Sequence, residues 1–250
     1  MPEPAGRLKI VDMWVDPIDM DQALGRIREF LVNGKRAHSI FAVNAEKNFA
    51  VTKDPDVRAA IKEADLLMPD GISVVIAAKL LHNVRTSRVP GTDLMQKTCE
   101  LAARSRRRVF IYGGKEEVNK KAVEKLQEMY PALQVVGRSD GYIEEDEMQD
   151  LIRRINESKA EILFLGLGSP RQEKWYLDHK DQLKTVKVCQ GIGGTLDTIA
   201  GTVKRAPRIW QRCGLEWLYR LLKEPSRIKR QKILPLFVFR LLAVKVRSFL

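Results

Sequence analysis

The sequence predicts an α/β protein, built on a parallel sheet flanked by helices, with a helical appendage at its C-terminal end. Short apolar runs alternate with helical stretches of 10–15 residues through the first 200 residues, a pattern typical of βαβ units with right-handed crossovers. Three of these runs end in glycine-rich turns, and most of the net charge gathers in the last fifty residues. We therefore divide the chain into a sheet-forming core, 1–200, and a basic appendage, 201–250.

The first half of the chain contains the signals for three strands and the helices between them. Asp19 suits the N-cap of one helix, and Pro55 suits the first position of another. A polar loop over 85–92 precedes a helix that begins at Asp93. The predicted strands are 8–15, 38–43 and 65–68, and the predicted helices are 19–31, 45–49, one from 54–55, 72–81 and 93–105.

The second half is organised around the stretch 161–175. Its run 162–165 is fully apolar, too short for a helix and followed by glycine, which predicts a strand buried on both faces. Ser169 suits an N-cap, Pro170 the first helical position and Gln172 the third position of a capping box. A helix N-terminus here favours an anion, although an ordinary βα turn explains the same residues. The other predicted strands are 108–112, 133–137 and 186–190, with helices over 116–130 and 144–158.

Polar residues and glycines follow the predicted strands where each strand ends. In parallel α/β sheets, ligands bind beyond these carboxyl ends. Three glycine-rich ends in one sheet favour a nucleotide or phosphate crevice, without a Walker A loop or a GxGxxG turn after the first strand. The residues at the strand ends are Asn44, Asp70, Gly113-Gly114, Gly166 to Gly168 and Gly191 to Asp197.

The location of the charge indicates a docking segment. Residues 201–250 contain 13 Lys and Arg against Glu216 and Glu224, and so account for +11 of the formal net charge of +12. Positive charge spread evenly along the chain would have suggested a nucleic-acid partner, whereas a basic C-terminal segment suggests a surface-binding device. We therefore expect no nucleic-acid partner.

The cysteines and histidines exclude several classes of site. Three cysteines and three histidines are scattered without metal spacing, which favours a reducing compartment and leaves no Ser-His dyad visible. We expect no resident metal and no cofactor. The N-terminus shows no basic, apolar leader, and no uncharged apolar run reaches 18 residues, so we expect neither secretion nor a membrane span.

Eight blocks of sequence follow one another along the chain: VNAEKNF (43–49), PDGISVV (69–75), SRVPGTDLM (87–95), GYI (141–143), LGLGSPRQEKW (165–175), GIGGTLD (191–197), VKRAP (203–207) and GLEWLYRLLKEPSRIKRQ (214–231). Taken together and in order, they resemble the WecG/TagA/CpsF family of bacterial glycosyltransferases over roughly residues 8–235. The resemblance implies a Rossmann-like core, a C-terminal membrane-binding appendage and no metal requirement. It also implies inverting transfer of N-acetylmannosamine, or its uronic acid, from UDP to undecaprenyl-diphosphate-GlcNAc.

Three residues are implied by the resemblance to serve catalysis. An inverting transfer needs a carboxylate to remove the acceptor hydroxyl proton, and Asp70 of the PDG block matches the family's base. Its alternative role is that of a turn-forming Asp. Asn44 matches a position near the donor sugar, and Arg88 matches an arginine that steadies phosphate charge, or is a solvated loop cation. Ala42 replaces a threonine of some relatives, which leaves the donor sugar open between several hexoses and uronic acids.

The remaining implied residues concern the nucleotide and the lipid. Gln172 matches a UDP-phosphate contact, and Tyr142 and Asp197 match uridine contacts. With the glycines at 113, 114, 166, 168, 193 and 194, they form the predicted UDP-sugar site. The residues implied to hold the lipid diphosphate are Arg220, Arg227 and Arg230, which share one helical face only if the helix continues past Pro225.

The last eighteen residues are apolar but broken by Arg240, Lys245 and Arg247. This pattern favours a helix lying in the plane of an anionic membrane, broken near its start by Pro235; a helical hairpin packed on the core is the alternative.

We therefore expect a peripheral enzyme on the cytoplasmic face of the plasma membrane, with homo-oligomer formation left open. Its rivals are an NAD-linked or sugar-nucleotide modifying enzyme and a non-enzymatic module that binds nucleic acid or anionic lipid. The first lacks an acidic ribose-binding residue about twenty residues after the first glycine turn. The second leaves Asp70 and the glycine-rich strand ends without a purpose.

Overall fold

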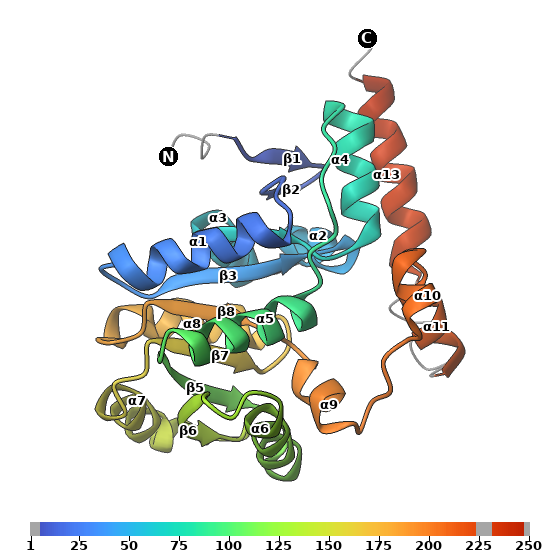
Figure 1. The fold of residues 1–250 in the computed structure, drawn as a ribbon. Helices are drawn as coiled ribbons and strands as arrows, with labels where there is room; N and C mark the ends of the chain where they lie inside the picture. Colours follow the sequence, from blue (N-terminus) through green and yellow to red (C-terminus); the bar gives the residue numbers. More distant parts are fainter. Residues whose placement is uncertain (1–5, 224–231, 248–250) are drawn as a thin grey trace.

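The computed structural model describes residues 6–223 and 232–247 of the 250-residue chain. Its centre is a six-stranded sheet with the order β4-β3-β8-β7-β5-β6, in which every neighbouring pair is parallel (Figure 1). The predicted α/β class is thereby confirmed. The strands are β3 (His38–Val43), β4 (Leu66–Pro69), β5 (Arg108–Gly113), β6 (Gln134–Ser139), β7 (Ile162–Gly166) and β8 (Val188–Gly191).

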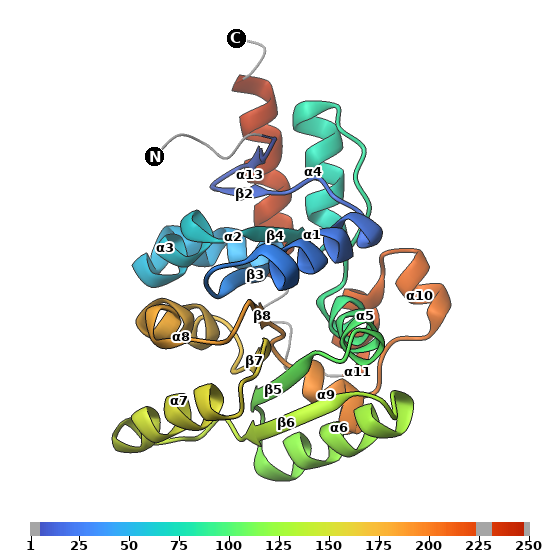
Figure 2. The same ribbon diagram turned by 60° about the vertical axis from the view of Figure 1, so that its left-hand side comes forward.

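Helices cover both faces of this sheet (Figure 2). The face seen toward the right in Figure 2 carries α1 (Met20–Asn33), α5 (Gly91–Arg104), α6 (Glu116–Met129) and α9 (Thr195–Ala200). The opposite face carries α2 (Ala45–Lys53), α3 (Pro55–Glu63), α7 (Met148–Glu157, preceded by the 3₁₀ turn Glu145–Glu147) and α8 (Arg171–His179, followed by the 3₁₀ turn Lys180–Gln182). The helix α4 (Ile72–His82) extends from the same side, where Val74, Ala77 and Ala78 join that core.

Strand β7 shows why a continuous apolar run was the correct signal. Its residues 162–165 are all fully buried, as predicted. Because successive side chains of a strand point to opposite faces, Leu163 and Leu165 join one core, and Ile162 and Phe164 join the other. A strand with helices on both sides therefore cannot alternate apolar and polar residues.

The predicted caps are partly confirmed. Asp19 accepts from the backbone N–H of Gln22, whose side chain returns to Asp19, so a capping box begins α1. The prediction for α8 was wrong, because the helix begins at Arg171, with Pro170 as its N-cap and no side-chain cap. Ser169 and Pro170 are joined by a cis peptide bond.

The predicted first strand was also wrong. Residues 8–15 form two short antiparallel strands, β1 (Leu8–Ile10) and β2 (Met13–Val15), rather than one strand of the main sheet. The chain reverses at Val11, which has a positive φ of 57°. The reversal buries Ile10, Met13 and Val15 together in the core.

The strand order creates a switch point beside β5 and β7. The connection leaving β5 leads outward to β6, whereas the connection leaving β7 leads the other way, to β8. Crossovers that diverge from neighbouring strands leave a crevice between their carboxyl ends, and ligands of doubly wound sheets bind there. Glycines follow both strands at this place.

In its described residues, the C-terminal segment forms the helices α10 (Arg208–Arg212), α11 (Glu216–Lys223) and α13 (Ile233–Arg247). Helix α13 packs beside α2 and α4 (Figures 1 and 2), with Phe237 and Leu241 buried in the core. Pro235 lies in its first turn, where a missing N–H costs little. No helix within residues 6–223 and 232–247 is long and apolar enough to cross a membrane.

Candidate active site

A cleft of about 250 Å³ lies at the switch point. Close backbone approach shapes it, because a Cβ on Gly113 would stand 2.4 Å from the carbonyl carbon of Gly166. Gly113 also has a φ of +130°, which side chains rarely permit, so this position requires glycine. The lining residues are Gly114, Lys115, Gly141, Tyr142, Gly166, Leu167, Gly168, Arg171, Gly193, Gly194 and Asp197.

Seven of the nine residues predicted to bind the UDP-sugar line this cleft together. Of the other two, Gly113 ends β5 at the side of the cleft, where its backbone lies close to that of Gly166. Gln172 is only 4% exposed; its Oε1 accepts from Gly193 N at 3.0 Å, and its Nε2 donates to Glu173. The predicted capping role of Gln172 is therefore wrong, while its contact with UDP phosphate stays a prediction. The seven lining residues are Gly114, Tyr142, Gly166, Gly168, Gly193, Gly194 and Asp197.

Two cationic side chains that the sequence did not single out also line the cleft, Lys115 and Arg171. Arg171 donates to the carbonyl of Gly141 at 2.6 Å, and its guanidinium carbon lies 6.0 Å from the centre of the Tyr142 ring. The Tyr142 side chain is largely exposed, and its backbone N–H is held by the Asp140 carboxylate. The cleft thus offers an accessible aromatic ring and positive charge.

A buried amide holds the ends of β5 and β6 together below the cleft. Asn119, on α6, donates from Nδ2 to the carbonyls of Gly113 at 2.7 Å and Ser139 at 2.9 Å. The Asn119 side chain is fully buried, so these bonds are shielded from water. Sequence reasoning missed this residue because a lone Asn in a helix carries no local signal for tertiary contacts.

Asn44 and Asp70 lie together at the ends of β3 and β4. Asp70 N donates to the carbonyl of Val43, and a Cβ on Gly71 would lie 3.2 Å from that of Asn44. The Asn44 side chain caps α2 by accepting from Lys47 N at 2.9 Å. The Asp70 carboxylate is half-buried and accepts from Gly91 N at 3.1 Å.

Short contacts connect Asp70 with the glycine cleft. Next to Gly91, the Thr92 hydroxyl lies 3.2 Å from the hydroxyl of Thr195. Thr195 follows Gly194, which lines the cleft. The start of α5 therefore contacts both the predicted base and the predicted nucleotide site.

A second cleft, of about 350 Å³, opens on the other side of Asn44. It lies between α2 and the turn that leads into α8, and charged side chains of both signs surround it. Its lining residues are Asn44, Glu46, Lys47, Ala50, Lys53, Asp54, Ser169 and Pro170.

Arg88 contacts the C-terminal segment. Its Nη2 lies 2.6 Å from the carboxylate of Glu216 on α11, and its Nη1 donates to the carbonyl of Gln211. Glu216 also lies 4.0 Å from Arg205, which makes a two-pronged ion pair with Asp93. The predicted alternative of a solvated loop cation is thus wrong for Arg88.

The charges of this cluster reach Asp70. The pKa of the Arg205 guanidinium is raised, first by its hydrogen bond to Asp93 and then by the charges of Asp93, Glu216 and Asp70. Sequence reasoning missed Arg205 and Glu216 as site residues. Both belong to blocks that carried the resemblance, yet the pair of Arg88 with Glu216 joins positions 128 residues apart.

A comparison with known proteins identifies the family of this chain. A model of the glycosyl transferase WecG/TagA/CpsF family matches residues 8–249. The chain belongs to this family. The match covers both the sheet and the C-terminal helices, so both residues of the Arg88–Glu216 contact lie within the matched region. As a WecG/TagA/CpsF glycosyltransferase, the chain is an enzyme, which decides against the oxidoreductase and the non-enzymatic binding module.

The role of three arginines of this glycosyltransferase in holding a lipid diphosphate stays a prediction. Arg220 falls within α11, whereas Arg227 and Arg230 lie outside the residues that the structure describes. Within the described part of the chain, no three His, Cys, Asp or Glu side chains gather in a way that could hold a metal ion.

Proposed function

We propose that this glycosyltransferase moves N-acetylmannosamine, or its uronic acid, from UDP to the GlcNAc of a polyprenyl-diphosphate acceptor, with inversion. The observation that carries the proposal is the linkage of a half-buried carboxylate, Asp70, to a glycine-lined cleft through the start of α5. A nucleotide in the cleft would place its sugar toward Asn44 and Asp70. Transfer of another hexose or uronic acid from UDP is the alternative, because Ala42 stands where some relatives have threonine.

Each group has a role in the proposed reaction. Asp70 accepts the proton of the attacking acceptor hydroxyl while the bond from the sugar carbon to UDP breaks and positive charge develops on the sugar. Lys115, Arg171 and the backbone N–H groups of the glycine turns offset the charge of the departing UDP. Arg88, fixed by Glu216, offers its guanidinium as a donor to phosphate oxygens on this side of the site. The proposed mechanism uses no metal.

Calorimetry with UDP and NADH tests the nucleotide assignment. We expect UDP to bind and Asp197→Ala to weaken that binding, because Asp197 lines the cleft. Val32→Ala, on an exposed face of α1, serves as the control that leaves UDP affinity unchanged. Binding of NADH without binding of UDP would contradict the nucleotide site.

A donor screen identifies the transferred sugar. Purified protein is mixed with a short-chain polyprenyl-diphosphate-GlcNAc acceptor and a set of UDP-sugars, and UDP release is measured. We expect the highest rate with UDP-N-acetylmannosamine or its uronic acid, and little change after EDTA. Release from another UDP-sugar alone would select the alternative donor, and a Mg²⁺-reversible loss with EDTA would refute the metal-free mechanism.

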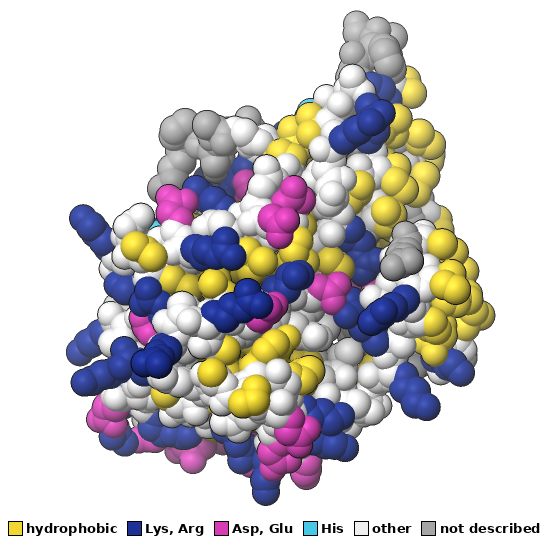
Figure 3. Space-filling view, in the orientation of Figure 1, with side chains coloured by type: hydrophobic (Ala, Val, Ile, Leu, Met, Phe, Trp, Pro, Cys, Tyr) yellow, Lys and Arg dark blue, Asp and Glu magenta, His cyan; other side chains and the backbone are white. Residues whose placement is uncertain are grey.

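We further propose that the enzyme works as a peripheral protein on an anionic membrane, at the cytoplasmic face. Helix α13 supports this proposal, because it buries only one side. Figure 3 shows hydrophobic side chains along the α13 side of the molecule, with Lys and Arg beside them. The exposed apolar residues of α13 are Leu236, Val238, Phe239, Leu242, Val244 and Val246. Apolar anchors combined with basic residues are typical of helices that lie in the membrane interface.

Point substitutions test membrane binding better than truncation. Deleting residues from 233 onward would also remove Phe237 and Leu241 from the core. Phe239→Glu, at 70% exposure, keeps those contacts and should reduce flotation with anionic liposomes. Val32→Glu, equally exposed on α1 at 71%, is the matched control. Equal flotation of both variants and the parent protein, or no flotation at all, would contradict the proposal.

A further inference from the structure

A buried ion pair joins α2 to α8 beneath the site. The Lys47 ammonium contacts the Glu173 carboxylate, and the two residues are 6% and 0% exposed. Removing two charges from water costs several kcal/mol per ion, and replacing such pairs by apolar residues is often neutral or stabilising. Stability alone therefore does not account for this pair.

The pair fixes the side chain of Gln172. Oε1 of Glu173 accepts from Lys47 and also from Nε2 of Gln172, at 3.0 Å. The other end of the Gln172 amide, Oε1, accepts from Gly193 N at 3.0 Å. A Cβ on Gly191 would lie 2.7 Å from Nε2, so β8 packs tightly against the amide as well. Gln172 is thus held at both ends, and its orientation depends on the carboxylate of Glu173.

The same contacts extend to Asn44. The backbone N–H of Lys47 donates to Asn44 Oδ1, and both residues line the larger cleft. A continuous series of contacts therefore runs from Asn44 through Lys47, Glu173 and Gln172 to Gly193. It begins in one cleft and ends in the other.

We propose that Lys47 and Glu173 are positioning residues for the UDP-sugar. They act through Gln172, which holds the backbone of Gly193 where the turn lines the nucleotide cleft. Gly193 has a φ of +52° and no side chain, so contacts to its backbone determine the shape of this turn. The inference rests on the proposed UDP-sugar site and adds two residues that do not themselves line the nucleotide cleft.

The decisive variant removes both charges at once, Lys47→Met with Glu173→Leu. No unpaired charge remains, so the unfolding temperature should stay unchanged or rise. The dissociation constant for UDP should nevertheless increase about tenfold, because Gln172 loses the acceptor that orients it. In the donor assay, KM for the UDP-sugar should rise more than kcat falls. Adding Gln172→Ala should weaken binding little further, since residues acting through one another are non-additive.

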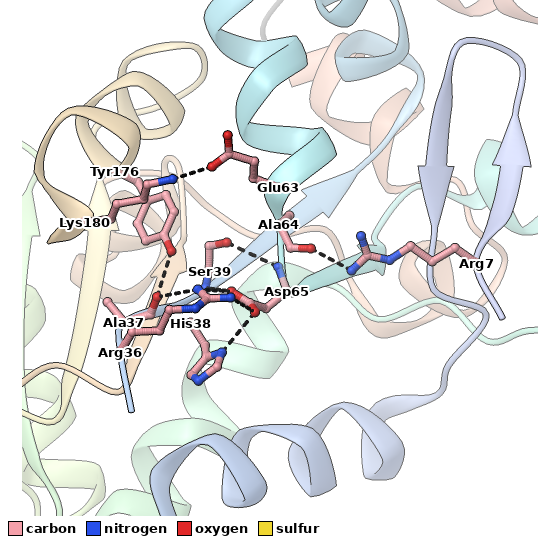
Figure 4. Close-up of polar contacts among 10 residues, drawn as sticks. All are labelled: Arg7, Arg36, Ala37, His38, Ser39, Glu63, Ala64, Asp65, Tyr176 and Lys180. Atoms are coloured by element: carbon pink, nitrogen blue, oxygen red, sulfur yellow. Dashed lines mark hydrogen bonds and ion pairs between the residues drawn. The ribbon is translucent and has the colours of Figure 1, made fainter. Parts of the chain in front are cut away.

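A matched control lies on the same helix. Tyr176 donates its buried hydroxyl to the carbonyl of Ala37 at 2.7 Å, at the amino end of the sheet (Figure 4). Tyr176→Phe removes this bond and should leave UDP affinity unchanged. If the double variant does not fold, Glu173→Asp takes its place in the test. It keeps the charge but shortens the side chain, and it should weaken UDP binding.

The outcomes separate the two proposals. Failure of the parent protein to bind UDP contradicts the proposed function. If the parent protein binds UDP and the folded double variant binds it equally well, the positioning role alone is wrong. It is also wrong if Glu173→Asp binds UDP like the parent protein, or if Tyr176→Phe loses as much affinity as the double variant.

Discussion

Two aspartates at opposite ends of β4 show how position decides the use of a carboxylate. Asp65 comes directly before the strand, and its oxygens accept from Arg36 at 2.6 and 2.9 Å and from Ser39 N at 2.9 Å, with His38 Nδ1 at 3.0 Å (Figure 4). Asp70 comes directly after the strand and accepts from a backbone N–H, that of Gly91. The first carboxylate is surrounded by donors of its own chain, and the second lies at the glycine-rich edge.

The difference follows from the direction of the sheet. At the amino end, Arg36, His38 and Asp65 close the gap between β3 and β4. At the carboxyl end, the turns diverge and leave space for a ligand. The variants below test this contrast.

Asp70→Asn should have the largest effect. Asn forms the same turn but accepts a proton poorly, so we expect turnover to fall by about 10²–10⁴ while the fold is kept. UDP affinity should stay within about twofold of the parent value by calorimetry. A variant that retains most of its turnover would return Asp70 to a turn-forming role and remove the contrast with Asp65.

Asp65→Asn should affect folding rather than catalysis. Loss of charge-assisted bonds to Arg36 and His38 should lower the free energy of unfolding by about 2 kcal/mol. Denaturant titration measures this change, and the turnover of the folded protein should match that of the parent. A selective loss of turnover without loss of stability would show that the amino edge takes part in the reaction.

Glu216→Gln should reduce turnover about tenfold, because Arg88 loses the carboxylate that orients it. UDP affinity should be unchanged, since neither residue lines the nucleotide cleft. Glu63→Gln, which breaks an ion pair with Lys180 at the amino edge, is the matched control and should have normal turnover. Equal turnover of the two variants would show that the orientation of Arg88 does not affect the reaction.

Tyr142→Ala should have the smallest effect. The exposed ring offers a stacking surface for a base, and its loss should weaken UDP binding about fivefold, at the lower end of base–aromatic stacking. Tyr142→Phe keeps the ring and should bind UDP like the parent protein. Normal affinity of the alanine variant would place the base elsewhere in the cleft.

The carboxyl edge could be predicted from the sequence because its signals are local. A buried apolar run followed by glycine marks a strand end, and parallel strands bring such ends to one side. The residues around Gly113, Gly166 and Gly193 were therefore expected together, and seven of the nine predicted residues line one cleft.

Most of the failed or missing predictions involve partners distant in sequence, and the hairpin at 8–15 is the exception. Gln172 fits a capping box locally, but Gly193 and Glu173 bind its side chain instead. The Arg88–Glu216 pair and the hydrogen bonds from Asn119 to the ends of β5 and β6 give no local pattern at all. The hairpin at 8–15 was missed because a run of this length fits one strand as well as two; only the positive φ of Val11 separates them.

The contact between α13 and the N-terminal hairpin has a consequence for synthesis. Arg240 pairs with Asp12 and lies over the ring of Phe49, while Phe237 fills the core beside them. The two members of the ion pair are 228 residues apart. At 5–20 residues per second, roughly 10–45 s pass between their incorporation on the ribosome. During that interval the apolar surface that Phe237 later covers stays open to chaperones, and the core is completed only when α13 emerges.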